Sequence, residues 1–162
     1  MIAAFELAGV FAAHGIWCLS DGDGLIPMLA FQTADGERQM RRFAMEELGQ
    51  GVELGKQQLA SNEMQASVAA LVYDGRITLE TGKVDALIIE IRSYATPQAE
   101  AVVAIPYTPQ STGQFAVHRP KLLAWDHCDE FEIDDAFQAF FAGVDSHEKG
   151  AEVWNQSIDD SL

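Results

Sequence analysis

The chain has 162 residues, of which 48% are hydrophobic, and its 25 acidic and 10 basic side chains give a formal net charge of −15. This length fits one domain, and the apolar content is too high for an intrinsically disordered chain. The charge argues against nucleic acids and membrane surfaces as partners, because anionic phosphates and headgroups would repel the protein.

Residues 2–13 are almost entirely apolar, so the N-terminus must be tested as a signal peptide or a membrane span. No Lys or Arg precedes this run, Glu6 interrupts it, and the stretch at 7–20 without charged residues is shorter than a span of ~20 residues. The sequence therefore predicts a buried helix over 2–14, ended by Gly15, in a cytoplasmic protein. Gly9 would leave a notch for close packing. Because the helix is apolar nearly all round, we expect a sheet and a neighbouring element, or a second subunit, to cover it.

Short strands are predicted next. Segments 16–20 and 25–33 read as strands, with the DGDG sequence at 21–24 as the hairpin turn between them. A second turn at 34–37 leads to a strand at 38–44, whose three arginines are typical of an exposed sheet edge. Residues 45–60 have helical spacing but contain three glycines, which favours a helix only if another element packs closely against it.

The clearest turn signal is Asp74-Gly75, which is flanked by apolar segments at 68–73 and 76–80. A two-residue turn there would put Val72 and Ile77 on the same face of a hairpin. Further strands at 84–92, at 99–105 (closed by Pro106) and at 114–118 are separated by loops at 95–98 and 107–113. The sequence thus predicts an antiparallel meander from residue 68 to about residue 123, with one packed face.

Residues 133–142 fit an amphipathic helix with Phe137, Phe140 and Phe141 on one side and Gly143 as its end. Asp145 and Glu148 resemble a capping box for a further short helix through Trp154. We expect one domain over 1–155 and a frayed tail over 156–162. The predicted fold class is α+β: an antiparallel meander sheet of about five to seven strands, packed by an N-terminal, a middle and a C-terminal helix.

Neither a metal site nor a cofactor is predicted. Residues 126–130 include every metal-ligand type, but adjacent residues cannot all face one ion, and no second ligand pair has a suitable spacing. The DGDG segment lacks the alternating ligands and the closing glutamate of a calcium loop.

Cys18 and Cys128 are the two cysteines, and their low number favours separate buried thiols in a reducing cytoplasm. His14 and His127 lie near them in the sequence. However, a helix end followed by a strand would point His14 and Cys18 in different directions, and adjacent side chains in an extended segment rarely meet. No motif of a nucleophilic, phosphate-binding or dinucleotide-binding enzyme is present, so no catalytic residue is predicted.

Two groups of charged residues remain as candidate binding sites. His118, Arg119 and Lys121, joined by Arg92 if strands 84–92 and 114–118 are neighbours, could hold an anion or simply pair with surface carboxylates. From residue 126 onward the chain has 11 acidic residues and one lysine, a net charge of −10, interleaved with aromatic residues. This segment is either a solvated face over core aromatics or a docking surface for a basic partner, with these candidate contacts: Glu130, Glu132, Asp134, Asp135 and Trp154.

The sequence leaves two functions open. The first is a non-enzymatic acidic protein-binding or adaptor domain that engages a basic protein and forms a homo-oligomer, most simply a dimer. In bulk properties alone the chain resembles secretion chaperones and toxin-immunity proteins, and because no motif carries this resemblance, it assigns no role to any residue. The alternative is a small-molecule-binding domain or enzyme with a pocket between sheet and helices near His118 and Arg119.

Overall fold

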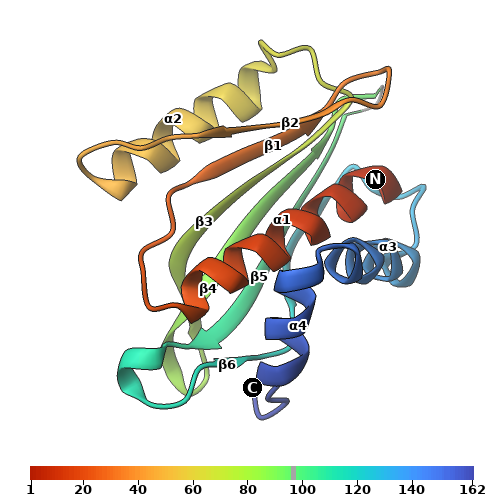
Figure 1. Ribbon diagram of the computed structural model, residues 1–162. Coiled ribbons are helices and arrows are strands. Elements are labelled where there is room, and N and C mark those ends of the chain that lie inside the picture. The colour runs from red at the N-terminus through yellow and green to blue at the C-terminus, as the bar shows by residue number, and fades with distance from the viewer. Residues whose placement is uncertain (96–97) are drawn as a thin grey trace.

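The computed structural model describes residues 1–95 and 98–162. Within these residues an antiparallel sheet of seven strands is packed by four α-helices, which confirms the predicted α+β class with its N-terminal, middle and C-terminal helices (Figure 1). The helices are α1 (Ile2–Ser20), α2 (Leu48–Ser61), α3 (Ile133–Ser146) and α4 (Glu148–Ser157), and a 3₁₀ turn, η1, covers Gln110–Thr112. The strands are β1 (Met28–Gln32), β2 (Arg38–Arg42), β3 (Val68–Leu79), β4 (Gly82–Ser93), β5 (Ala99–Thr108), β6 (Ala116–Val117) and β7 (Lys121–Asp126).

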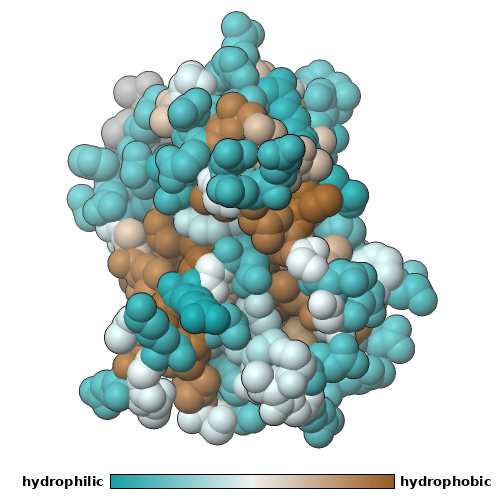
Figure 2. All heavy atoms as spheres, turned by 90° about the vertical axis from the view of Figure 1, so that its left-hand side faces the viewer, coloured by the Kyte–Doolittle hydropathy of each residue, from teal (hydrophilic) through white to brown (hydrophobic). Residues whose placement is uncertain are grey.

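The sheet runs in the order β2-β1-β3-β4-β5, and β6 and β7 both pair with the far edge of β5. As predicted, the arginine-rich β2 is an exposed edge strand. Helices α1, α3 and α4 pack on one face of the sheet, and α2 packs on the opposite face against β1 and β3 (Figure 1). On that opposite face, beyond α2, Ile77, Ile88 and Val102 form an apolar cluster, and Figure 2 shows hydrophobic atoms exposed on this side of the molecule.

The first helix is longer than the sequence predicts. A strand at 16–20 is wrong, because α1 continues through Gly15 to Ser20 and buries Ile16 and Leu19. Gly15 packs against Leu87 of β4, where a larger side chain would crowd the leucine. The DGDG segment therefore links a helix to β1 and is not a hairpin turn.

The apolar surface of α1 is covered within the chain, by β3 and β4 on one side and by α3 and α4 on the other. By length and composition alone α1 would suffice to cross a membrane, but here most of its apolar side chains lie in the core. From the sequence we expect α1 to be covered either by a sheet and a neighbouring element or by a second subunit. The structure shows the first of these arrangements.

Two glycines bring α1 and α3 into backbone contact. A Cβ at Gly9 would overlap the carbonyl oxygen of Phe140, and a Cβ at Gly143 would overlap the carbonyl oxygen of Glu6. The notch expected at Gly9 is thus present. The prediction that Gly143 ends its helix is wrong, because α3 needs this glycine for the crossing and continues to Ser146.

The predicted hairpin at Asp74-Gly75 is also wrong. Strand β3 runs straight through these residues, with Asp74 opposite Leu87 and Gly75 opposite Ala86, and the chain turns after Leu79. Ile77 therefore lies on the face opposite Val72. The continuous ladder keeps its hydrogen bonds and packs the half-buried Ile77 against a small apolar cluster, and these gains outweigh the local turn preference of Asp-Gly.

Smaller differences concern the later boundaries. Strand β5 continues through Pro106, and of the predicted loop at 95–98, residues 96 and 97 lie outside the described residues. Helix α4 is capped by His147, whose Nδ1 accepts a hydrogen bond from the Gly150 N–H, and not by Asp145. In the segment where we expected fraying, Ile158 pairs with Val117.

In helix α2, two of the three glycines confirm the expectation of close packing, whereas Gly49 has no atom within 4 Å of an added Cβ. A Cβ at Gly51 would meet the carbonyl oxygen of Phe43 at 2.5 Å, and one at Gly55 would meet the Leu71 side chain at 2.6 Å. Both glycines let this helix lie close to the sheet.

Candidate functional site

The basic residues predicted as an anion site do not gather in one place. His118 is only 4% exposed; its Nδ1–H donates to the carbonyl oxygen of Asp159 at 2.8 Å, and its Nε2 is hydrogen-bonded to the Thr108 hydroxyl at 3.0 Å. Both ring nitrogens are therefore used to fasten the C-terminal segment to the sheet. Pro120 lies between β6 and β7, outside both strands. This position suits proline because it has no backbone N–H to donate to a neighbouring strand.

The other three residues of this group are separated. Arg119 forms an exposed ion pair with Asp160 at 3.3 Å, and Lys121 begins β7. Arg92 pairs with Glu100 at the opposite end of β5 from the β6 contact. No common anion site results from these positions.

Of the five residues predicted to contact a basic partner, the four acidic ones lie on the surface and the tryptophan lies in the core. Glu130, Glu132, Asp134 and Asp135 are exposed just before and within the first turn of α3, where they suit the positive end of the helix dipole. Trp154 is 4% exposed and packs edge-on against Phe140 and Phe141, so its ring belongs to the core.

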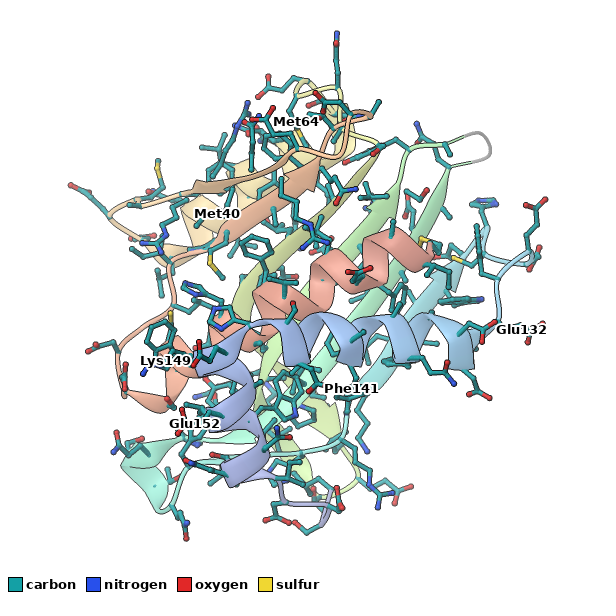
Figure 3. The ribbon with its side chains drawn as sticks, turned by 45° about the vertical axis from the view of Figure 1, so that its right-hand side comes forward. Met40, Met64, Glu132, Phe141, Lys149 and Glu152 are labelled. Atoms are coloured by element: carbon teal, nitrogen blue, oxygen red, sulfur yellow. The ribbon has the colours of Figure 1, made fainter. Side chains whose placement is uncertain are left out.

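A shallow groove follows the outer side of α3. The lining side chains recur every three or four residues along the helix and combine apolar and acidic groups: Asp134, Phe137, Gln138, Phe141, Ala142 and Asp145. Phe141 is 37% exposed and extends from α3 toward α4, where its ring contacts Trp154 (Figure 3). The groove thus has an aromatic floor and carboxylates at both ends.

The two cysteines are free and lie near opposite ends of α1. Cys18 is in its last turns, whereas Cys128 is buried beside the N-terminus and its thiol donates to the carbonyl oxygen of Glu100. Burial raises the pKa of both thiols, which disfavours the reactive thiolate. Across residues 1–95 and 98–162, no three His, Cys, Asp or Glu side chains are grouped as metal ligands.

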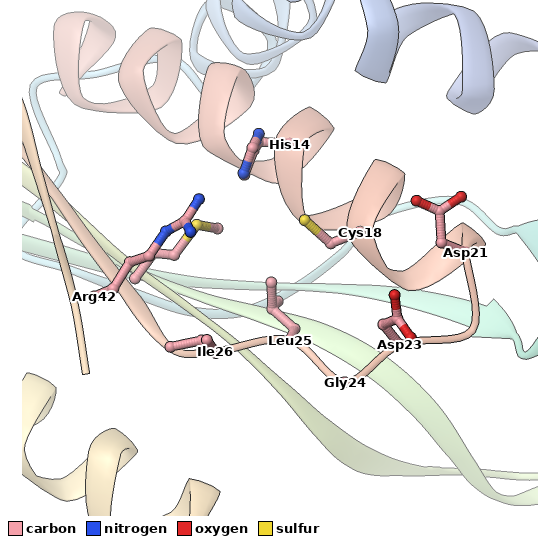
Figure 4. Close-up of a pocket in the computed structure, with 9 residues that line it drawn as sticks. His14, Cys18, Asp21, Asp23, Gly24, Leu25, Ile26 and Arg42 are labelled. Carbon is pink, nitrogen blue, oxygen red and sulfur yellow. The ribbon is translucent and has the colours of Figure 1, made fainter. Parts of the chain in front are cut away.

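A pocket beside the C-terminal end of α1 was missed by the sequence reasoning. His14 and Cys18 stand one turn apart on the same face of α1, and Arg42 of β2 faces them across a cavity of about 240 Å³ (Figure 4). The signal that could have found it is the i, i+4 spacing of His14 and Cys18, which points both side chains the same way once the helix extends to Ser20. The erroneous strand at 16–20 concealed it.

Hydrogen bonds fix the tautomers of two histidines at this pocket. Because the Gly150 N–H can only donate, Nδ1 of His147 is an acceptor, and Nε2 of His147 carries the proton. That Nε2–H donates to Nδ1 of His14 at 3.3 Å, which leaves the proton of His14 on Nε2. Within the described part of the chain this buried Nε2–H has no hydrogen-bond partner.

The charge state of His14 follows from its surroundings. Burial, and then His147 and the Arg42 guanidinium, hold the pKa of His14 below its ordinary value. The ring is therefore neutral at neutral pH and acts as a hydrogen-bond donor, not as a cation.

Comparisons with protein families, with curated proteins and with solved structures find no match to this chain. The functional argument therefore depends on the surfaces described above.

Proposed function

We propose that this protein is a non-enzymatic adaptor or binding domain whose acidic α3 surface holds a basic, amphipathic segment of another protein. The observation that carries the proposal is the groove on α3, with Phe137 and Phe141 on its floor and Asp134 and Asp145 at its ends. These two aspartates are 11 residues apart in the helix, or about 16 Å. A helical segment of about three turns, with an apolar stripe flanked by lysines or arginines, would match both the floor and the rim.

The distribution of charge supports the same partner. The segment from residue 126 onward has a net charge of −10, and among the described residues Arg119–Asp160 is its one ion pair with a basic side chain. A concentrated, largely uncompensated negative surface accelerates the association of a basic partner and rejects acidic ones.

A binding titration tests the proposal. The probe is a fluorescently labelled amphipathic helical peptide of about four turns, with leucines at i, i+3, i+4 and i+7 and lysines or arginines elsewhere. We expect saturable binding that weakens as salt is added. Replacing both rim residues, Asp134→Asn with Asp145→Asn, should weaken binding by about fivefold or more, because two carboxylates near the bound cations are lost.

Two further variants separate a groove from general attraction. The control Glu46→Gln with Glu47→Gln removes the same charge from exposed positions before α2 and should change the affinity by less than about twofold. Ala142→Lys fills the groove from an exposed position without altering the core, and should abolish binding. Equal weakening by both double variants, or unchanged binding by Ala142→Lys, would overturn the proposal.

Three further expectations from the sequence concern the cellular location, the oligomeric state and a ligand pocket near His118 and Arg119. A cytoplasmic location stays part of the proposal and agrees with two free thiols. A dimer stays a prediction, although the apolar α1 that motivated it is covered inside the chain. A ligand pocket near His118 and Arg119 has less support, because both side chains already bind groups of the C-terminal segment.

A further inference from the structure

The pocket beside α1 contains two strong donors that lack acceptors. The Nε2–H of His14 has no partner, and among the described residues no ion pair involves the guanidinium of Arg42. Arg42 lies directly across the β1–β2 ladder from Met28 and faces the same side of the sheet. Its exposed, flexible side chain can turn to admit an oxygen between itself and His14. A carboxylate is the acceptor that best fits a guanidinium fork together with a neighbouring N–H.

The opposite side of the same pocket carries negative charge. Asp21 and Asp23 follow α1 and line the pocket on the side away from Arg42, with Cys18 and Leu25 between the two ends (Figure 4). A ligand with two or more negative charges would be repelled by these carboxylates and by the net charge of −15. An amino group on the ligand would instead be attracted to them.

The walls between the charged ends are apolar. Leu25, Ile26 and Met28 contribute aliphatic surface, and the volume of about 240 Å³ is somewhat below that of sites for drug-sized ligands. The pocket is therefore suited to a small molecule with an aliphatic body.

We infer that this pocket binds a small zwitterion of the amino-acid class, with its carboxylate held by Arg42 and the His14 Nε2–H, its amino group facing Asp21 and Asp23, and its hydrocarbon part against Leu25 and Met28. This site lies on a different surface from the α3 groove. It is independent of the function proposed there, and either can fail without the other.

Calorimetric or NMR titration with four probes tests the inference. Leucine and 6-aminohexanoate carry both charges, with short and long spacing between them, whereas hexanoate and hexylamine carry one charge each. We expect at least one zwitterion to bind saturably, about tenfold or more tighter than hexanoate and hexylamine, because only a zwitterion uses both ends of the pocket. Failure of both zwitterions to saturate the protein at millimolar concentrations, or equal binding of hexanoate, would overturn the inference.

Variants assign the binding to this pocket. Arg42→Gln should weaken the zwitterion by about tenfold or more, since it removes the charged fork that binds the carboxylate. Asp23→Asn should weaken the zwitterion but leave hexanoate unchanged or tighter. The matched control is Arg38→Gln, which removes the same charge from the same face of β2, four residues from Arg42 and about 13 Å away, and should leave the affinity unchanged.

Thermal unfolding without ligand checks that each variant is folded, as expected because the replaced side chains are exposed on the edge strand β2 or in the loop after α1. Unchanged affinity in folded Arg42→Gln, or an equal loss in Arg38→Gln, would contradict the assignment of the carboxylate site.

Discussion

At the scale of single residues, two tyrosine hydroxyls donate hydrogen bonds to carboxylates that are partly buried on the sheet. The Tyr107 hydroxyl donates to Oδ1 of the half-buried Asp74 at 2.7 Å, and the Tyr73 hydroxyl donates to Oε2 of Glu90 at 2.7 Å. Asp74, which looks like a turn residue in the sequence, is thus the hydrogen-bond partner of a tyrosine on β5. Burial raises its pKa, and the bond from Tyr107 opposes that rise.

These tyrosines predict a loss of stability at alkaline pH. Burial, together with carboxylate partners for Tyr73 and Tyr107, raises the pKa of Tyr73 and Tyr107 well above 10, and the pKa of Tyr94 to about 12. Because the unfolded chain releases these protons from about pH 10, the stabilisation is complete below pH 10 and is lost as the pH rises through 12. Urea unfolding midpoints measured between pH 8 and pH 12 should fall over this interval.

Tyr107→Phe separates the two effects of that hydroxyl. At pH 8 the variant should be less stable by about 1–3 kcal/mol, because the Asp74 carboxylate loses its donor. Above pH 10 its stability should fall less steeply than that of the parent, since one group with a raised pKa is gone. Identical slopes in the two proteins would contradict this assignment.

The candidate residues show what the sequence can and cannot reveal at this scale. The exposed carboxylates at 130–135 are recognisable from charge alone, because a run of acidic residues before a helix is solvated in nearly any fold. His14 and Arg42 are not recognisable, since they are 28 positions apart and meet only through the packing of β2 beside α1. His118 is a polar residue whose burial depends on a carbonyl group 41 positions later.

At the scale of elements, close approach of α1 and α3 organises the helical layer. Gly9 and Gly143 face the backbone of the opposite helix reciprocally, and Gly150 of α4 similarly faces Ala13. Small residues at such crossings let the helix axes come closer than ordinary side chains allow.

The crossing predicts a contrast between glycines. Gly9→Ala and Gly143→Ala should each destabilise the fold by about 1–3 kcal/mol or more, because the added methyl group meets backbone that must move. In Gly49→Ala on α2, no atom lies within 4 Å of the added carbon, so the variant should be stabilised by up to about 1 kcal/mol. Chemical denaturation of the three variants measures this, and a stabilised Gly9→Ala would show that the helices are not in backbone contact.

Glycines also explain which helix ends and turns the sequence does not predict correctly. Periodicity predicts the strands of the meander and the starts of α1 and α3, because burial of one face is encoded locally. The ends of α1 and α3 and the turn of the β3–β4 hairpin are missed, because Gly15, Gly143 and Asp74-Gly75 carry local signals that distant packing overrides. The sequence alone does not distinguish a glycine that is needed for a close contact from a glycine that ends a helix.

At the scale of the whole molecule, acidic charge and apolar surface are unevenly distributed. The segment from residue 126 onward, which contains α3, α4 and the loops beside them, has a net charge of −10, and the fold places both helices against α1 on one face of the sheet (Figure 1). This asymmetry is readable from the sequence, whereas the alignment of Phe137 and Phe141 with two aspartates along one groove emerges only from the packing of α3.

The most direct measurement of the central claim is the mapping of a basic amphipathic peptide onto the protein by NMR chemical shifts. We predict that the amide signals that shift on titration cluster along 130–145, with the largest changes next to Phe141 and Ala142. The signals of residues 45–57 serve as the internal control and should not shift. In this region Met45 and Leu48 are 46% and 47% exposed and lie close to glutamates, so it also combines apolar and acidic surface. Shifts spread evenly over both regions, or centred on 45–57, would contradict the assignment of α3 as the docking surface.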